Sequence, residues 1–91
     1  MIYLWLDDVR LPPKGWTWVK TVAKAKQQLL TGQVIAASLD HDLGELEDGT
    51  DLVEWMAEQN VWPSRKPIVH SANPVGAARM RQIIDRYWNP W

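Results

Sequence analysis

Short apolar runs alternate with helix-like patterns along this chain. Three runs show no regular polar alternation, which is typical of parallel strands that are buried on both faces; they cover residues 2–6, 34–39 and 67–71. A shorter run at 16–20 does alternate and predicts a further strand. Tandem prolines followed by Gly15 exclude a continuous helix between the first two strands, so we expect a loop there.

Three segments show the periodicity of amphipathic helices. Thr21 can cap the first helix, which should run to about Thr31. Thr50 or Asp51 should open the second helix, and the segment "VWPSRKP" should end it. The third helix follows "ANPVG" and carries an apolar face made by Met80, Ile83, Ile84 and Tyr87. This alternation of strands and helices predicts an α/β fold.

The length of 91 residues suits a single domain, residues 1–91, whose core would be filled in part by Trp5 and Trp55. The chain has no cysteine, and none of its apolar runs approaches the roughly 20 residues needed to span a bilayer. It also shows no charged-then-apolar leader at its start. We therefore expect a cytoplasmic protein without a membrane partner.

Charge is unevenly distributed, although the net charge is only −1. Residues 1–35 carry five Lys and Arg against two Asp, and residues 61–91 carry five against one. Residues 36–60 carry eight Asp and Glu and no basic residue. This segregation argues against a uniformly basic nucleic-acid binder, whereas basic flanks around an acidic centre suit a phosphorylated ligand.

Polar side chains follow each of the three expected buried strands, as Asp7-Asp8, Asp40-His41-Asp42 and His70-Ser71. Ligands of open parallel sheets bind beyond the carboxyl ends of the strands, so these residues should meet at one edge. Neighbouring strands lie about 4.8 Å apart, and Asp7 or Asp8 should therefore face Asp40 if their strands are adjacent. Like charges at that distance oppose folding unless a divalent cation, Mg²⁺ or Mn²⁺, lies between them. The pattern predicts a metal pocket.

Other polar residues of the acidic region have alternative explanations. Asp48 and Asp51 are expected to be turn formers or helix caps. Asp42 either joins the metal site or only shapes its loop. His41 and His70 are either structural residues or proton-transfer groups. With two histidines and no cysteine, the composition argues against a zinc cage.

The segment "HSANPVG" predicts an anion-binding element. Ser71 and Asn73 supply polar side chains, and backbone N–H groups near Gly76, where the last helix opens, are donors for a phosphate. Arg10, which follows the first strand, can bring positive charge to that phosphate. Arg79, one turn into the helix, either does the same or is a solvated residue.

Three motifs together resemble the receiver superfamily, and most closely its branch of cyclic-phosphate-processing receiver domains: "LDD" at 6–8, "LDHDLG" at 39–44 and "HSANPVG" at 70–76. The resemblance covers nearly the whole chain. It implies a truncated, receiver-like (flavodoxin-like) domain of three layers, with a mostly parallel four-stranded sheet and about three helices. It also implies that Asp7 and Asp8 help to bind Mg²⁺, that Asp40 matches the phosphoryl-accepting aspartate of signalling receivers, and that Ser71 contacts the phosphoryl group.

The chain departs from complete receivers in two places. It has no helix between the first two strands, and it ends at "RYWNPW" without the fifth strand and its phosphate-binding lysine. Instead of a stable aspartyl phosphate, the resemblance implies metal-assisted opening of cyclic phosphate ends, on RNA or nucleotides. Asp40, His41, His70 and Ser71 would then be catalytic.

Two other functions stay open. A non-enzymatic protein-binding module, such as an inhibitor or adaptor, would use Trp88 and Trp91 of the aromatic tail as anchors. A phosphate-switched receiver would accept a phosphoryl group on Asp40, and the missing lysine weighs against it.

Overall fold

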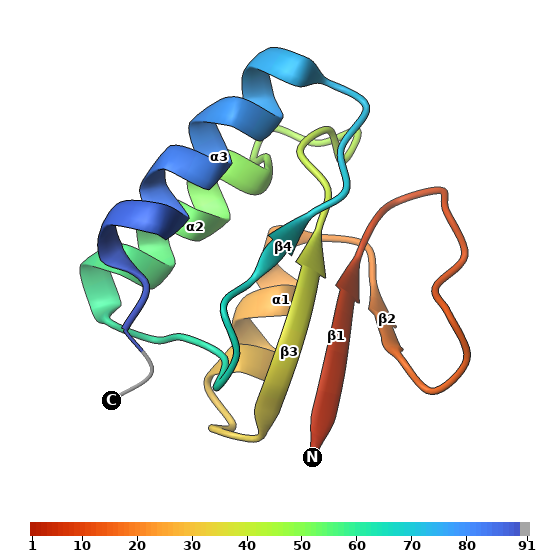
Figure 1. Ribbon diagram of the computed structural model, residues 1–91. Coiled ribbons are helices and arrows are strands. Elements are labelled where there is room, and N and C mark those ends of the chain that lie inside the picture. Colours follow the sequence, from red (N-terminus) through yellow and green to blue (C-terminus); the bar gives the residue numbers. More distant parts are fainter. Residues whose placement is uncertain (90–91) are drawn as a thin grey trace.

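The computed structural model describes residues 1–89. The strands and helices follow in the order β1 (Ile2–Leu6), β2 (Thr17–Val19), α1 (Val22–Leu29), β3 (Val34–Leu39), α2 (Gly49–Gln59), β4 (Ile68–Val69) and α3 (Pro74–Tyr87). The strands form a parallel sheet with the order β2-β1-β3-β4 (Figure 1). The predicted α/β fold and its element order are confirmed. Within residues 1–89, no helix has both the length and the apolar character that a membrane crossing requires.

The three helices of the described chain lie on one face of the sheet, with α2 packed between α1 and α3 (Figure 1). Leu4 and Leu6 of β1 point toward the helices and are fully buried, whereas Tyr3 and Trp5 point to the opposite face. The described chain thus has two layers, and the expectation of three was wrong. The reason is the loop between β1 and β2, which stands where a complete receiver has a covering helix. Trp16 of this loop lies edge-on against Tyr3 and Trp5 and covers part of the open face.

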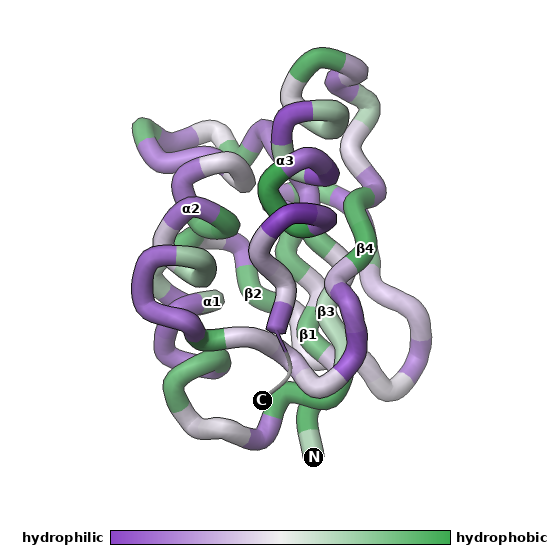
Figure 2. The backbone as a smooth tube through the Cα atoms, turned by 60° about the vertical axis from the view of Figure 1, so that its left-hand side comes forward, coloured by the Kyte–Doolittle hydropathy of each residue, from purple (hydrophilic) through white to green (hydrophobic). Residues whose placement is uncertain are grey.

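The core lies between the sheet and the helices and consists mainly of aliphatic side chains and methionines, among them Leu6, Leu39, Leu52, Val53, Met56, Met80 and Ile84. Hydrophobic and hydrophilic positions alternate along α2 and α3, as Figure 2 shows. Trp55 is only partly buried at the margin of this core, and Trp5 lies on the far side of the sheet. The expectation that these two tryptophans fill the core was therefore wrong.

Side-chain caps determine where the helices begin. Thr21 caps α1 as expected. Asp48 and Asp51 form a reciprocal capping box, so that α2 begins at Gly49, one or two residues before the expected start. Asn73 caps α3 with its side chain. The interpretation of Asp48 and Asp51 as helix-capping residues is confirmed.

The fourth strand is shorter than the expected 67–71. It comprises Ile68–Val69 at the edge of the sheet, and Ile68 is 60% exposed, so this strand is not buried on both faces. Because all four strands are parallel, their carboxyl ends lie at one edge of the sheet, the upper edge in Figure 1. The loops that follow β1, β3 and β4 all start there.

Candidate metal and phosphate site

Two carboxylates and one imidazole meet at this edge. β1 and β3 are adjacent and pair Leu6 with Leu39, so Asp7 and Asp40, the next residues of each strand, lie side by side. His70 follows directly on β4. One ligand atom from each of Asp7, Asp40 and His70 lies within 4.8 Å of the others. Of the two alternatives left by the sequence, it is therefore Asp7 that faces Asp40.

The Asp7 carboxylate is completely buried but well supplied with hydrogen bonds. Its Oδ1 accepts the backbone N–H groups of Val9 at 2.9 Å and Arg10 at 2.8 Å, and its Oδ2 lies 2.9 Å from His70 Nε2. Burial raises the pKa of the Asp7 carboxyl, but these donors and the His70 ring outweigh burial and bring the pKa below its ordinary value. Asp7 is thus held as a carboxylate.

Asp40 has the opposite balance. It is 8% exposed, and its Oδ1 accepts the N–H of His41 at 2.8 Å. Burial raises the pKa of Asp40, the His41 N–H lowers it, and the charge of Asp7 raises it again, so that the pKa lies above its ordinary value. Of the two neighbouring carboxylates, the ionised form of Asp7 is therefore favoured by its surroundings and that of Asp40 is disfavoured.

The donor atoms at this edge fit a divalent cation. Asp7 Oδ1 accepts two backbone N–H groups and Asp40 Oδ1 accepts one, so a ligand would meet the second oxygen of each carboxylate, of which Asp7 Oδ2 also contacts His70 Nε2. Hard divalent cations take such oxygens together with water, and an imidazole nitrogen is a further metal ligand in proteins. A cation bound here would also relieve the repulsion between the two carboxylates.

Both the ring and the backbone oxygen of His70 are held in place by neighbouring side chains. Its ring stacks on the Trp5 indole, with the ring centroids 4.0 Å apart and the planes 5° from parallel. Its backbone oxygen accepts Arg10 Nη1 at 2.8 Å. Arg10, predicted to contact phosphate, is thereby anchored beside the acidic pair, and within residues 1–89 its guanidinium makes a hydrogen bond through Nη1 alone.

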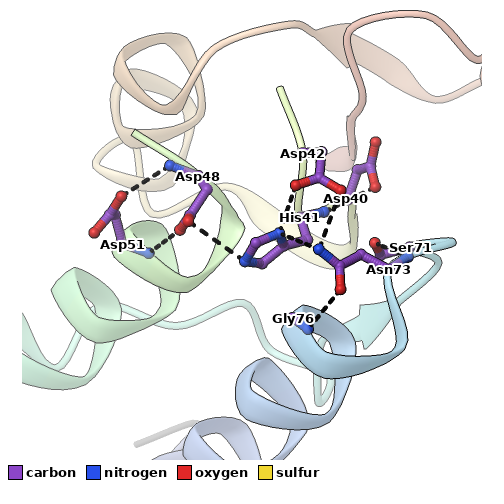
Figure 3. A network of polar contacts seen from close by, with 8 residues as sticks. All are labelled: Asp40, His41, Asp42, Asp48, Asp51, Ser71, Asn73 and Gly76. Atoms are coloured by element: carbon purple, nitrogen blue, oxygen red, sulfur yellow. Dashed lines mark hydrogen bonds and ion pairs between the residues drawn. The ribbon is translucent and has the colours of Figure 1, made fainter. Parts of the chain in front are cut away.

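His41 lies in a second polar network, which joins the loop after β3 to the starts of α2 and α3 (Figure 3). Its Nδ1 is 2.9 Å from Asp42 Oδ1, and its Nε2 is 3.4 Å from Asp48 Oδ2. Asn73 Nδ2 donates to Asp42 Oδ2 at 3.3 Å. The hydrogen bond with His41 lowers the pKa of the exposed Asp42 carboxyl. The structure thus pairs Asp42 with His41, outside the group of Asp7, Asp40 and His70.

The start of α3 is already occupied by its own cap. Asn73 Oδ1 accepts the N–H of Gly76 at 3.0 Å, its carbonyl oxygen accepts the N–H of Ala77, and its N–H donates to Ser71 Oγ at 3.0 Å. A phosphate that bound the N–H of Gly76 would have to replace its bond to Asn73 Oδ1. Gly76 has a different importance, because a Cβ at this position would overlap the His41 ring.

The remaining predicted residues, as far as residues 1–89 include them, lie outside both networks. Asp8 Oδ2 faces the loop after β3 and would lie 3.2 Å from a Cβ at Gly44. Arg79 is exposed on the surface of α3. Trp88 is partly buried against the core and donates its Nε1 hydrogen to Pro63 O at 3.4 Å, while Trp91 lies outside the described residues.

Residues 2–86 match a family model described as the cyclic-phosphate processing receiver domain. The chain belongs to this family. The match runs from β1 almost to the end of α3 and so includes the acidic pair and both histidines. Comparison with curated proteins and with solved structures gave no match.

Two features of the site in this cyclic-phosphate processing receiver domain were not predicted from its sequence. His70 was expected only as a proton-transfer or structural residue, yet it lies among the potential metal ligands. Ser38 was not considered, yet its Oγ lies 2.7 Å from His70 Nδ1. The available signal was a lone hydroxyl in the apolar run "VIAASL", two residues before Asp40 and thus on the same face of the strand.

Proposed function

We propose that this receiver domain is a divalent-metal-dependent phosphoesterase that opens cyclic phosphate ends of RNA or nucleotides. The observation that carries the proposal is the meeting of Asp7, Asp40 and His70 within 4.8 Å at the carboxyl edge of a parallel sheet. Membership of the cyclic-phosphate processing family supports the choice of substrate class.

Asp7, Asp40 and His70 hold Mg²⁺ or Mn²⁺ in this proposal. When bound, the cation supplies positive charge that polarises a phosphoryl oxygen and makes water a better nucleophile. The closeness of the Asp7 and Asp40 carboxylates favours cation binding, because the cation neutralises the repulsion between them. Asp7, whose pKa is lowered, stays ionised and ready to bind.

Arg10 and Ser71 are the residues that we assign to the phosphate. Arg10 is fixed by its bond to the His70 carbonyl, and Ser71 lies between Asp40 and Asn73. We assign the proton of the leaving oxygen to His41. Both of its ring nitrogens have carboxylate oxygens within 3.4 Å, so a proton on either nitrogen has an acceptor. Asn73 and Gly76 position His41 in this account.

The test is turnover of 2′,3′-cyclic nucleotides and of oligonucleotides with cyclic ends, in the presence of Mg²⁺ or Mn²⁺. Asp7→Asn and Asp40→Asn should abolish turnover, and His41→Gln should lower it by about 10²- to 10⁴-fold, as expected for a lost general acid. Asp85→Asn, which removes a carboxylate from an exposed ion pair with Lys66, is the matched control and should behave like wild type. Intact protein without turnover on this panel would refute the proposal.

The structure favours the two alternatives less. Trp88, proposed as an anchor for a protein partner, uses its indole to pack against the core and to bond Pro63. Asp40, proposed as phosphoryl acceptor, is buried and already accepts a hydrogen bond from the N–H of His41. Treatment with acetyl phosphate and Mg²⁺ should therefore leave the mass of the protein unchanged.

A further inference from the structure

The imidazole of His70 is fixed on three sides. Its face stacks on Trp5, its Nε2 lies 2.9 Å from Asp7 Oδ2, and its Nδ1 lies 2.7 Å from Ser38 Oγ. Trp5 and Ser38 are register partners on β1 and β3, so both side chains rise from neighbouring positions on the open face of the sheet. The ring therefore has one orientation, with Nε2 directed at the acidic pair.

Ser38 is an unusual residue for its place in the sheet. It is 1% exposed in an otherwise apolar strand, and a buried hydroxyl is costly unless it is hydrogen-bonded. Its hydrogen bond within residues 1–89 is the one to His70 Nδ1. The Ser38 hydroxyl thus bonds Nδ1 of His70, on the ring edge opposite the proposed metal ligand atom Nε2.

A hydroxyl suits this position because the same oxygen atom can both donate and accept. With a proton on Nε2, His70 donates to Asp7, and its Nδ1 accepts the hydroxyl hydrogen of Ser38. With the proton on Nδ1, His70 donates to Ser38 Oγ, and the lone pair of Nε2 faces Asp7 and Asp40. The two states hold the same number of protons, and in both Ser38 Oγ is hydrogen-bonded to Nδ1.

We propose that Ser38 is a positioning residue that lets His70 exchange tautomer, from an Nε2–H donor bonded to Asp7 into an Nε2 ligand of a divalent cation shared with Asp7 and Asp40. The cation is the one in the proposed function, and the inference rests on that function only for the binding of this cation. On cation binding the Nε2 proton is released, a proton is taken up at Nδ1, and the Ser38 hydroxyl rotates from donor to acceptor.

A role of Ser38 as a nucleophile does not fit the geometry. The serine is 1% exposed, and it lies on the Nδ1 side of the ring, away from the carboxylates that face Nε2. An attacking oxygen has to reach the phosphorus atom, and a buried hydroxyl bonded to Nδ1 of the imidazole does not. Ser38 acts through His70.

The experiment follows the ring nitrogens of His70 by ¹⁵N NMR, in the protein without metal and after addition of Zn²⁺, chosen because it is diamagnetic and binds imidazole. Mn²⁺ affinity is measured in parallel by calorimetry. The proteins are wild type, Ser38→Ala and Ser38→Thr, with Ser64→Ala as the control for loss of an exposed serine hydroxyl. His70→Gln identifies the resonances.

We expect the wild-type ring to change from the Nε2–H to the Nδ1–H tautomer when Zn²⁺ binds. Ser38→Ala should weaken Mn²⁺ binding by about tenfold to a hundredfold, the usual effect of losing the hydrogen-bond partner of a metal-ligating histidine. Ser38→Thr, which keeps the hydroxyl, should restore most of the affinity, and Ser64→Ala should change nothing.

The proposal is overturned if His70 keeps its Nε2–H tautomer in the presence of Zn²⁺, or if Ser38→Ala binds Mn²⁺ like wild type. It is equally overturned if wild type binds neither ion. A protein that binds the cation and exchanges tautomer but turns over no cyclic phosphate supports the role of Ser38 and refutes the proposed activity instead.

Discussion

Replacing Asp40 with Asn should stabilise the metal-free protein and abolish its stabilisation by cations. The pKa of Asp40 is raised in the folded protein, first by burial and then by the charge of Asp7. Folding therefore disfavours the ionised form. This unfavourable contribution is absent below the ordinary range of an aspartate, grows between the ordinary and the raised pKa, and has its full size above the raised pKa. An amide has no charge to be disfavoured, and its Oδ1 still accepts the N–H of His41.

The magnitude follows from the distance between the carboxylates. Two unit charges within 4.8 Å of each other repel by at least roughly 3 kcal/mol at an effective dielectric constant of about 20. His70 and the backbone donors offset part of this repulsion. We expect Asp40→Asn to raise the free energy of unfolding by about 1–2 kcal/mol in the absence of metal, which corresponds to about 4–16 °C in Tm for a domain of this size.

The assay is thermal unfolding at pH 7, followed by tryptophan fluorescence in EDTA and in excess Mn²⁺. Mn²⁺ at a hundred times its Kd should add about 2.7 kcal/mol to wild type and almost nothing to Asp40→Asn, so the order of stability should reverse between the two conditions. Asp85→Asn should respond to metal like wild type. If Asp40→Asn is the less stable protein in EDTA, or gains as much from Mn²⁺ as wild type, the reasoning about the carboxylate pair is wrong.

Three further perturbations test other parts of the structure. Asp7 has a lowered pKa, so its carboxylate stabilises the fold above the ordinary aspartate range and loses this effect as the pH falls through the lowered pKa. In urea unfolding, Asp7→Asn should lower the free energy of unfolding at pH 7 by about 1–3 kcal/mol, with a difference that shrinks in acid; a constant difference would contradict the assignment. Gly76→Ala should displace His41, seen as changed ¹⁵N shifts of its ring together with lost turnover, because the new Cβ overlaps the imidazole. Trp88→Ala should lower the free energy of unfolding by about 2 kcal/mol while calorimetry finds Mn²⁺ affinity unchanged, since the indole packs on the core away from the acidic pair.

Much of the fold follows from local patterns in the sequence. Apolar runs without alternation gave β1 and β3 with their observed bounds, because a strand in the middle of a parallel sheet requires apolar residues on both faces. The same rule failed for β4, whose two residues at the sheet edge need no such burial. The number of layers did not follow from local patterns either, because it depends on the loop carrying Trp16, which covers part of one face of the sheet in place of a helix.

The candidate site was predictable to the level of the sheet edge but not of individual atoms. The rule for parallel sheets brought Asp7, Asp40 and His70 to one edge, and the structure places them together. It did not decide between Asp7 and Asp8, since that choice depends on which side chain turns toward β3. It also gave no warning that Asn73 would occupy the N–H of Gly76, because capping is settled by side-chain geometry.

Ring opening itself is the most direct test of the proposed activity. The measurement is ³¹P NMR of uridine 2′,3′-cyclic phosphate with wild-type protein and Mg²⁺ in ¹⁸O-labelled water, with EDTA and Asp40→Asn as the two controls. The account predicts that the cyclic phosphate signal is replaced by that of a monoester carrying one ¹⁸O atom, with wild type and metal only. A cyclic signal that persists, in protein shown by its thermal shift to bind the cation, would contradict it.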